Sequence, residues 1–103
     1  MKFPKPEKIV DKDYLAWIER RPCMICHKER AGFKANSSDA HHINDKSGGS
    51  AKYNDHRTIP LCFDHHREIH QIGKDTFTKK YNLVDLEIYI EAYREIYKRS
   101  NLP

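Results

Sequence analysis

The sequence has few of the features that mark secreted or membrane-spanning proteins. It contains three cysteines, and an odd number argues against the disulfide framework of a small secreted domain. No apolar run approaches the roughly 20 residues that a membrane-spanning helix needs, and the Met1 end lacks the apolar segment of a signal peptide. We therefore expect no membrane partner and a cytoplasmic, reducing location.

Apolar side chains are also scarce. Hydrophobic residues make up 38% of the 103 positions and charged residues 33%, so one small domain would bury only a thin core. Chains of this kind often draw stability from a metal ion or a partner. The net charge of +4 and the isoelectric point near 9.0 suit a polyanionic partner without identifying one.

The N-terminal part is expected to divide into an arm and a helix. Residues 1–10 carry prolines and lysines with little periodicity, which predicts a flexible basic arm. A helix is predicted over about residues 13–21. Asp11 or Asp13 is placed to cap its start, and Pro22 ends it.

Two further helices are predicted near the C-terminus. Phe77 and Tyr81 stand four apart and indicate a short helix after Gly73, which is placed to cap the helix before it. Asp85 is placed to cap a final helix over about residues 85–99. Tyrosines on its apolar face could stack on nucleic-acid bases, but docking on a core is the more common use of such a face and is expected here.

Two short segments in the middle of the chain are predicted to be strands. Residues 39–44 alternate in character, and residues 57–61 are β-branched and apolar. Pro60 has to lie at an edge or an end because it has no amide hydrogen to donate. Ser-Gly-Gly-Ser at residues 47–50 would supply a flexible turn between the strands.

The densest group of metal-binding residue types lies in a predicted helix over about residues 64–72 and just before it. His66 and His70 stand four apart, one turn along the same face. Cys62 and His65 stand three apart, around the cylinder from that pair. One short helix could therefore offer ligands to two different metal ions.

A structural zinc ion takes four cysteine or histidine ligands, in pairs with two to four residues between partners. Cys23-x-x-Cys26, interpreted as a zinc-knuckle turn, supplies one pair, and Cys62-x-x-His65 supplies the other. His66 is the alternative fourth ligand if the helix begins differently. Ordinary buried cysteines and a redox CxxC are the competing interpretations, but no hydrophobic strand or βαβ pattern surrounds the CxxC.

The remaining histidines suit hydrolysis of a phosphodiester. Neighbouring strand residues point to opposite sides, so one of His41 and His42 would join a cation held by His66 and His70 while the other reaches the far side of the scissile group. A divalent ion stabilises charge on the phosphate, and a neutral imidazole accepts a proton from water. The alternatives are packing, a second structural metal, or a zinc module that only binds nucleic acid.

These residues form an ordered set that resembles a known family. The set is Arg21-Pro22-Cys23-x-x-Cys26, Ala40-His41-His42-Ile43, Asp55, and Thr58-Ile59-Pro60-Leu61-Cys62-x-x-His65-His66-x-x-x-His70. It resembles the HNH endonucleases, most closely the Ref-like recombination-enhancement nucleases of phages and prophages. The resemblance implies an α+β fold, a small zinc-supported ββα-metal (His-Me finger, treble-clef-like) domain with flanking N- and C-terminal helices. A single nuclease domain would cover residues 11–103, with its core at residues 21–81.

The resemblance also implies roles for individual residues. His42 corresponds to the general base, and His41 to a ligand of the catalytic cation together with His66 and His70. The supporting zinc would be held by Cys23, Cys26, Cys62 and His65. The catalytic cation in such enzymes is commonly Mg²⁺ or Mn²⁺, and histidine-rich sites also accept Zn²⁺ or Ni²⁺.

The middle asparagine of the HNH pattern has no clear counterpart in this chain. Position 57 is arginine, and the nearest candidates are Asn54 and Asp55. Asp55 matches the phage group better, and we assign it an orienting role beside His42. The exact geometry of the base depends on this residue.

The expected activity is metal-dependent hydrolysis of DNA with weak sequence specificity, by a phage or prophage protein in the cytoplasm of a bacterial host. Arg57, Arg67 and Lys52 are candidate phosphate contacts because they lie near the site in the sequence. A recombination or replication protein is a possible partner that the resemblance suggests. The alternative function is a non-catalytic zinc-finger adaptor that binds DNA or protein and tolerates loss of the strand histidines.

Overall fold

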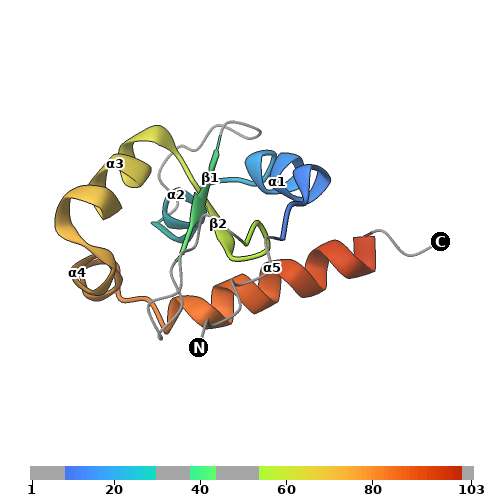
Figure 1. The fold of residues 1–103 in the computed structure, drawn as a ribbon. Helices are drawn as coiled ribbons and strands as arrows, with labels where there is room; N and C mark the ends of the chain where they lie inside the picture. Colours follow the sequence, from blue (N-terminus) through green and yellow to red (C-terminus); the bar gives the residue numbers. More distant parts are fainter. Residues whose placement is uncertain (1–8, 30–37, 44–53, 101–103) are drawn as a thin grey trace, which may run out of the picture.

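A two-stranded antiparallel hairpin lies at the centre of the fold, with helices packed around it (Figure 1). The computed structural model describes residues 9–29, 38–43 and 54–100 of the chain. The described elements are α1 (Lys12–Glu19), α2 (Met24–Glu29), β1 (Asp39–His42), β2 (Thr58–Leu61), α3 (Phe63–Ile72), α4 (Lys74–Lys80) and α5 (Leu86–Ser100). The expected α+β class is confirmed. Among the described helices, none is long and apolar enough to cross a membrane.

The hairpin forms where the two strands were predicted. β1 and β2 pair antiparallel in a register that sets His41 opposite Ile59 and His42 opposite Thr58. Pro60 pairs with Ala40, and a sheet of two strands has only edge strands, so its missing amide hydrogen is tolerated. The turn predicted at residues 47–50 lies outside the described residues.

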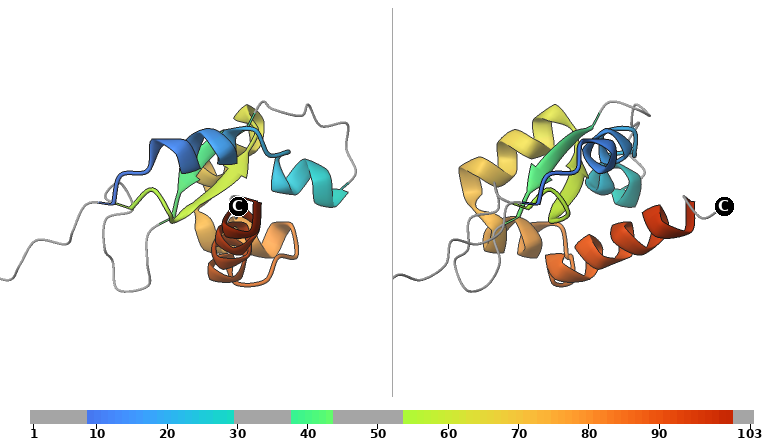
Figure 2. Two further views of the ribbon diagram at one scale, coloured as in Figure 1. Left: turned by 90° about the vertical axis from the view of Figure 1, so that its right-hand side faces the viewer. Right: turned by 45° about the vertical axis from the view of Figure 1, so that its right-hand side comes forward.

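The helices enclose the hairpin on several sides. α1 and α3 lie on opposite sides of it, and α5 runs beneath it and contacts β2 (Figures 1 and 2). All four residues of β2 are buried, and Ile59 and Leu61 are fully enclosed. Phe77 of α4 and Ile25 of α2 are also fully buried in this core. The hairpin is therefore held in place from several directions although it is short.

Helix ends follow the capping residues that the sequence supplies. The Asp11 carboxylate accepts a hydrogen bond of 3.0 Å from the Tyr14 amide, which caps α1. The Asp85 carboxylate accepts one of 3.0 Å from the Glu87 amide at the start of α5. Gly73 ends α3 with φ of 87°, a conformation that favours glycine, and α4 begins at once.

The tyrosines of α5 pack against α1. Tyr97 meets the rings of Tyr14 and Trp17 edge-on, with centroids 4.9 and 5.3 Å apart, and Tyr93 meets Trp17 at 6.4 Å. The expectation that this face docks on the core is confirmed. These edge-on contacts between aromatic rings join α5 to α1.

Two local predictions were wrong. The CxxC segment is not a bare turn: the His27 amide donates to the Cys23 carbonyl at 2.9 Å, so α2 begins directly after Cys23. Ile9 forms a parallel bridge with Asn54 and is thus part of the folded structure, not of the arm expected over residues 1–10. The remaining residues of that arm, 1–8, lie outside the described part of the chain.

An ion pair ties α5 to the hairpin. Arg57 donates to both carboxylate oxygens of Glu87, in one case at 2.8 Å, and to the Ile43 carbonyl at 3.1 Å. Both side chains are only partly exposed, at 18% and 34%. A bidentate pair of this kind is stronger than an isolated surface ion pair because its geometry is fixed and water is partly excluded.

We expect Glu87→Ala to lower the free energy of unfolding by about 1–3 kcal/mol, because Arg57 loses its charged partner. Glu95→Ala is the matched control on the same helix, since Glu95 pairs with Lys98 at 3.7 Å with both side chains mostly exposed. Urea unfolding followed by circular dichroism measures both. Equal midpoints for the two variants would contradict the anchoring role of Arg57.

Candidate metal centres

Four predicted ligands meet beside the N-terminus of α3 and form what we call the cysteine cluster: Cys23, Cys26, Cys62 and His65. The Nδ1 atom of His65 faces the three sulfur atoms at 3.4, 3.5 and 3.2 Å. The Cys26 and Cys62 sulfur atoms lie 3.9 Å apart. His65, and not its neighbour His66, is the histidine that completes this group.

The spacing of these atoms fits a tetrahedral metal ion. With Zn–S bonds of about 2.3 Å and Zn–N bonds of about 2.0 Å, tetrahedral angles separate two sulfurs by about 3.8 Å and a sulfur from a nitrogen by about 3.5 Å. The observed separations of 3.9 Å and 3.2–3.5 Å are close to these values. The cysteine cluster can therefore hold a metal ion such as zinc.

Ionisation of the cysteine cluster is linked to metal binding. Burial raises the pKa of the Cys26 thiol to about 12, and the neighbouring Cys23 and Cys62 sulfurs add to the shift. Three thiolates so close together would repel one another strongly unless a cation lay among them. A bound divalent ion would therefore displace protons from these thiols, and its binding would weaken as pH falls.

A second group, the histidine cluster, consists of His41 from β1 and His66 and His70 from α3. The three ring centroids lie 4.9 to 5.0 Å from one another. The Nε2 atoms of His66 and His70 are 3.2 Å apart, between the separations of about 2.9 and 3.4 Å for octahedral and tetrahedral nitrogen ligands. The histidine cluster could also hold a metal ion.

The ring of His41 is in the neutral state that metal binding requires. Burial lowers the pKa of His41 to about 4, and the neighbouring His66, His70 and His42 lower it further, so its ring is neutral near pH 7. His66 donates from Nδ1 to the Asp39 carboxylate at 3.0 Å. That bond leaves the Nε2 lone pair of His66 directed toward His70, as in many carboxylate–histidine–metal arrangements.

His42 lies on the other side of β1 and pairs with an acidic residue. Its Nε2 atom donates to Asp55 at 3.0 Å. Burial raises the pKa of Asp55, but hydrogen bonds from the Asp11 amide and from His42 outweigh burial and bring it below its ordinary value. Asp55 is therefore ionised near neutral pH and accepts a hydrogen bond from His42.

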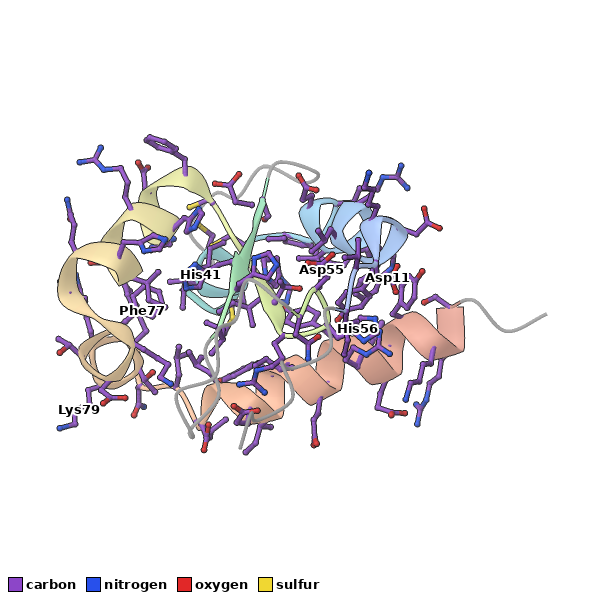
Figure 3. The ribbon with its side chains drawn as sticks, viewed as in Figure 1. Asp11, His41, Asp55, His56, Phe77 and Lys79 are labelled. Atoms are coloured by element: carbon purple, nitrogen blue, oxygen red, sulfur yellow. The ribbon has the colours of Figure 1, made fainter. Side chains whose placement is uncertain are left out.

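A cavity of about 250 Å³ joins the two sides of the strand. It is lined by His41, His42, Ile43, Ile69, His70 and Lys74. Figure 3 shows His41 on the side of the hairpin that faces α3, and Asp55 on the side toward α1. A small anionic group in this cavity would meet His41, His42, His70 and Lys74 together.

The candidate DNA contacts have different environments. Arg67 is exposed on α3, with its guanidinium carbon 5.8 Å from the ring centroid of Phe63. Arg57 is engaged by Glu87 and the hairpin backbone, which is a structural use of its charge. Lys52 lies outside the described residues.

The hydrogen-bond partners of the site histidines were not predicted from the sequence. Asp39 was not considered, although it stands two residues before His41 and so shares its face of the strand. The two-residue period of a strand is the signal from which Asp39 could have been predicted as a site residue. Asp11 was expected only as a helix cap, yet its amide donates to Asp55 at 2.9 Å. No local pattern links residues so far apart.

Comparison with known proteins gives the family. A model of DUF968, described as a protein of unknown function, matches residues 1–91. The chain belongs to the DUF968 family. The match includes every residue of the cysteine and histidine clusters.

A curated relative of this DUF968 chain is the uncharacterized protein YdfU of Escherichia coli (strain K12), 35% identical over 72 residues. The aligned part covers 68% of the chain but only 19% of the relative. The chain thus spans a small share of the length of that protein. No solved structure matches the chain.

We expect the DUF968 chain to bind one zinc ion tightly in the cysteine cluster and to lose its melting transition when the ion is removed, because small metal domains draw folding free energy from the metal. His65→Ala should lose this zinc and melt at much lower temperature. His70→Ala, on the same helix but in the histidine cluster, should retain both. Metal analysis and thermal circular dichroism after dialysis against a chelator measure these outcomes. An unchanged transition after verified zinc removal would contradict the expectation.

Proposed function

We propose that the chain is a metal-dependent endonuclease of the HNH class that hydrolyses DNA phosphodiester bonds with weak sequence specificity, in a phage or prophage context. One observation carries the proposal: His42, which pairs with Asp55, lines the same cavity as His41 and His70 of the histidine cluster. General-base catalysis on a phosphodiester needs a base and a positive centre on either side of the scissile group. A pure binding module has no need of this combination.

His42 is suited to the role of general base. Asp55 is ionised and can only accept a hydrogen bond, so a His42 ring with one proton would carry it on Nε2 and would leave the lone pair on Nδ1. The carboxylate also stabilises the imidazolium that forms when Nδ1 takes a proton from the attacking water. The pair thus resembles the histidine–carboxylate arrangement of other hydrolases in function, without implying common ancestry.

His41, His66 and His70 are the residues that would hold the catalytic cation. A divalent ion bound there would stabilise negative charge on the phosphate and on the leaving oxygen. Asp39 holds the His66 ring in the tautomer that leaves Nε2 free to bind. We infer Mg²⁺ or Mn²⁺ as the working ion, with Zn²⁺ or Ni²⁺ as alternatives that imidazole ligands also accept.

The arrangement of elements supports a ββα-metal fold. The hairpin β1–β2 is followed directly by α3, which contacts both strands. This helix carries His65 of the cysteine cluster and both His66 and His70 of the histidine cluster, and Cys62 is its N-cap. The cysteine cluster would hold the supporting zinc at the start of that helix. Among the described residues, Lys74, which lines the cavity, and Arg67, which is exposed on α3, would be the phosphate contacts in this proposal.

The test is cleavage of supercoiled plasmid by purified protein in EDTA and then with Mg²⁺, Mn²⁺, Ni²⁺ or Zn²⁺. We expect nicking that requires added metal, and we expect His42→Ala to slow it by about 10²-fold or more while DNA binding persists. His27→Ala, a histidine of α2 in neither cluster, is the control and should cleave like the parent chain.

Two results would contradict the proposal. Cleavage at the parental rate by His42→Ala would remove that residue from the role of base. A DNA mobility shift without cleavage by any of the four ions would favour the zinc-finger adaptor, in which the histidine cluster is dispensable.

Arg67 offers a separate test of the DNA-binding surface. We expect Arg67→Ala to weaken DNA binding uniformly across sequences and to lower the slope of log K against log salt by about 1, because one phosphate contact is lost. Fluorescence anisotropy at several salt concentrations measures the slope. An unchanged slope would exclude a phosphate contact by Arg67.

A further inference from the structure

Two histidine–aspartate pairs lie next to each other on the α1 side of the hairpin. The first is His42–Asp55, and the second is His56–Asp11, in which His56 Nε2 donates to the Asp11 carboxylate at 3.0 Å. Asp11, Asp55 and His56 lie together in Figure 3. The proposed base mechanism uses only the first pair, which leaves the second without a role.

The two pairs are joined through Asp11. Its backbone amide donates to Asp55 Oδ2 at 2.9 Å, while His42 Nε2 donates to Asp55 Oδ1 at 3.0 Å. Both oxygens of the Asp55 carboxylate are thus held from different directions, so the carboxylate has little freedom to rotate. The position of the Asp11 amide therefore sets the position of the Asp55 oxygen that holds His42.

Asp11 is itself fixed by two hydrogen bonds to its carboxylate. Oδ1 accepts from the Tyr14 amide at 3.0 Å and Oδ2 accepts from His56. The His56 ring is held in turn by edge-on contact with the Tyr14 ring at 5.5 Å. Without His56, the Asp11 carboxylate would keep its helix-capping bond but would lose the contact that ties it to the neighbouring loop.

The backbone beside this network is anchored as well. The Asp55 amide donates to the Ile9 carbonyl at 3.0 Å, and the Thr58 hydroxyl donates to the Asp55 carbonyl at 3.1 Å. The loop before β2 therefore attaches to the segment before α1 through main chain and side chains together. This attachment joins parts of the chain that are 44 residues apart, from Asp11 to Asp55.

We propose that Asp11 and His56 are positioning residues for His42, which fix the Asp55 carboxylate and thereby hold the His42 ring in the Nε2–H tautomer with Nδ1 toward the cavity. The kinetic consequence of this inference rests on the proposed nuclease function. The orientation of the His42 ring does not, and it can be measured without any cleavage.

Two substitutions of His56 separate hydrogen bonding from packing. His56→Gln keeps a side-chain N–H donor near the position of Nε2 but removes the ring. His56→Phe keeps a ring against Tyr14 but removes the donor. Long-range ¹H–¹⁵N spectra of the imidazole rings report the His42 tautomer in each protein, and thermal melting reports whether each variant is folded.

We expect a single Nε2–H tautomer for His42 in the parent chain and in His56→Gln, and a mixture of tautomers in His56→Phe. We also expect His56→Phe to lower kcat by about tenfold or more, with KM and DNA affinity within twofold. A displaced His42 ring would slow proton transfer in the bound complex without changing how tightly the DNA is bound. His56→Gln should restore most of kcat.

The same His42 tautomer in folded His56→Phe as in the parent chain would overturn the inference. A fall in kcat in His56→Gln that His56→Phe does not show would overturn it as well. If the parent chain cleaves no DNA, the nuclease proposal fails, and the tautomer measurement still decides the role of Asp11 and His56. The two failures are therefore distinguishable.

Discussion

The rotation of α3 about its own axis is the constraint on which the rest of the site depends. Successive residues of an α-helix differ by about 100° in direction, so His65 and His66 must face different surroundings. His65 joins the cysteine cluster, and His66 faces β1 with His70 one turn further along. A metal ion in the cysteine cluster would lock this rotation, because Cys62 and His65 are attached to the first turn of the helix. With a metal ion bound, the cysteine cluster would thus position the histidine cluster without lining the cavity.

Side chains of the hairpin alternate between its two faces, so neighbouring residues of β1 also face different surroundings. His41 faces α3, and His42 faces Asp55 and the segment before α1, so one strand separates the histidine cluster from the hydrogen-bonded His42–Asp55 pair. Both His41 and His42 nevertheless line the same cavity. The position of β1 is fixed through β2, which is buried along its whole length and contacts four helices. The geometry of the site therefore depends on the packing of the small core.

The parts of the site that the sequence predicts are those encoded by local spacing. Cys62-x-x-His65 and His66-x-x-x-His70 determine helix faces directly, and Asp11, Gly73 and Asp85 mark helix ends by their own hydrogen bonding or backbone freedom. The unpredicted parts depend on which loop meets which helix. The Asp39–His66 bond, the Arg57–Glu87 pair and the contact of Asp11 with Asp55 join residues 27 to 44 positions apart, and no periodicity encodes such distances. The CxxC segment was misjudged because cysteine spacing fits a turn and the first turn of a helix equally well.

We propose that α3 serves two metal centres of different chemistry. The most direct measurement is anomalous X-ray scattering at the zinc and manganese edges from crystals of zinc-loaded protein soaked in Mn²⁺. We expect a zinc peak among Cys23, Cys26, Cys62 and His65, and a manganese peak among His41, His66 and His70. Zinc absent from the cysteine cluster, or no metal of either kind in the histidine cluster, would contradict it.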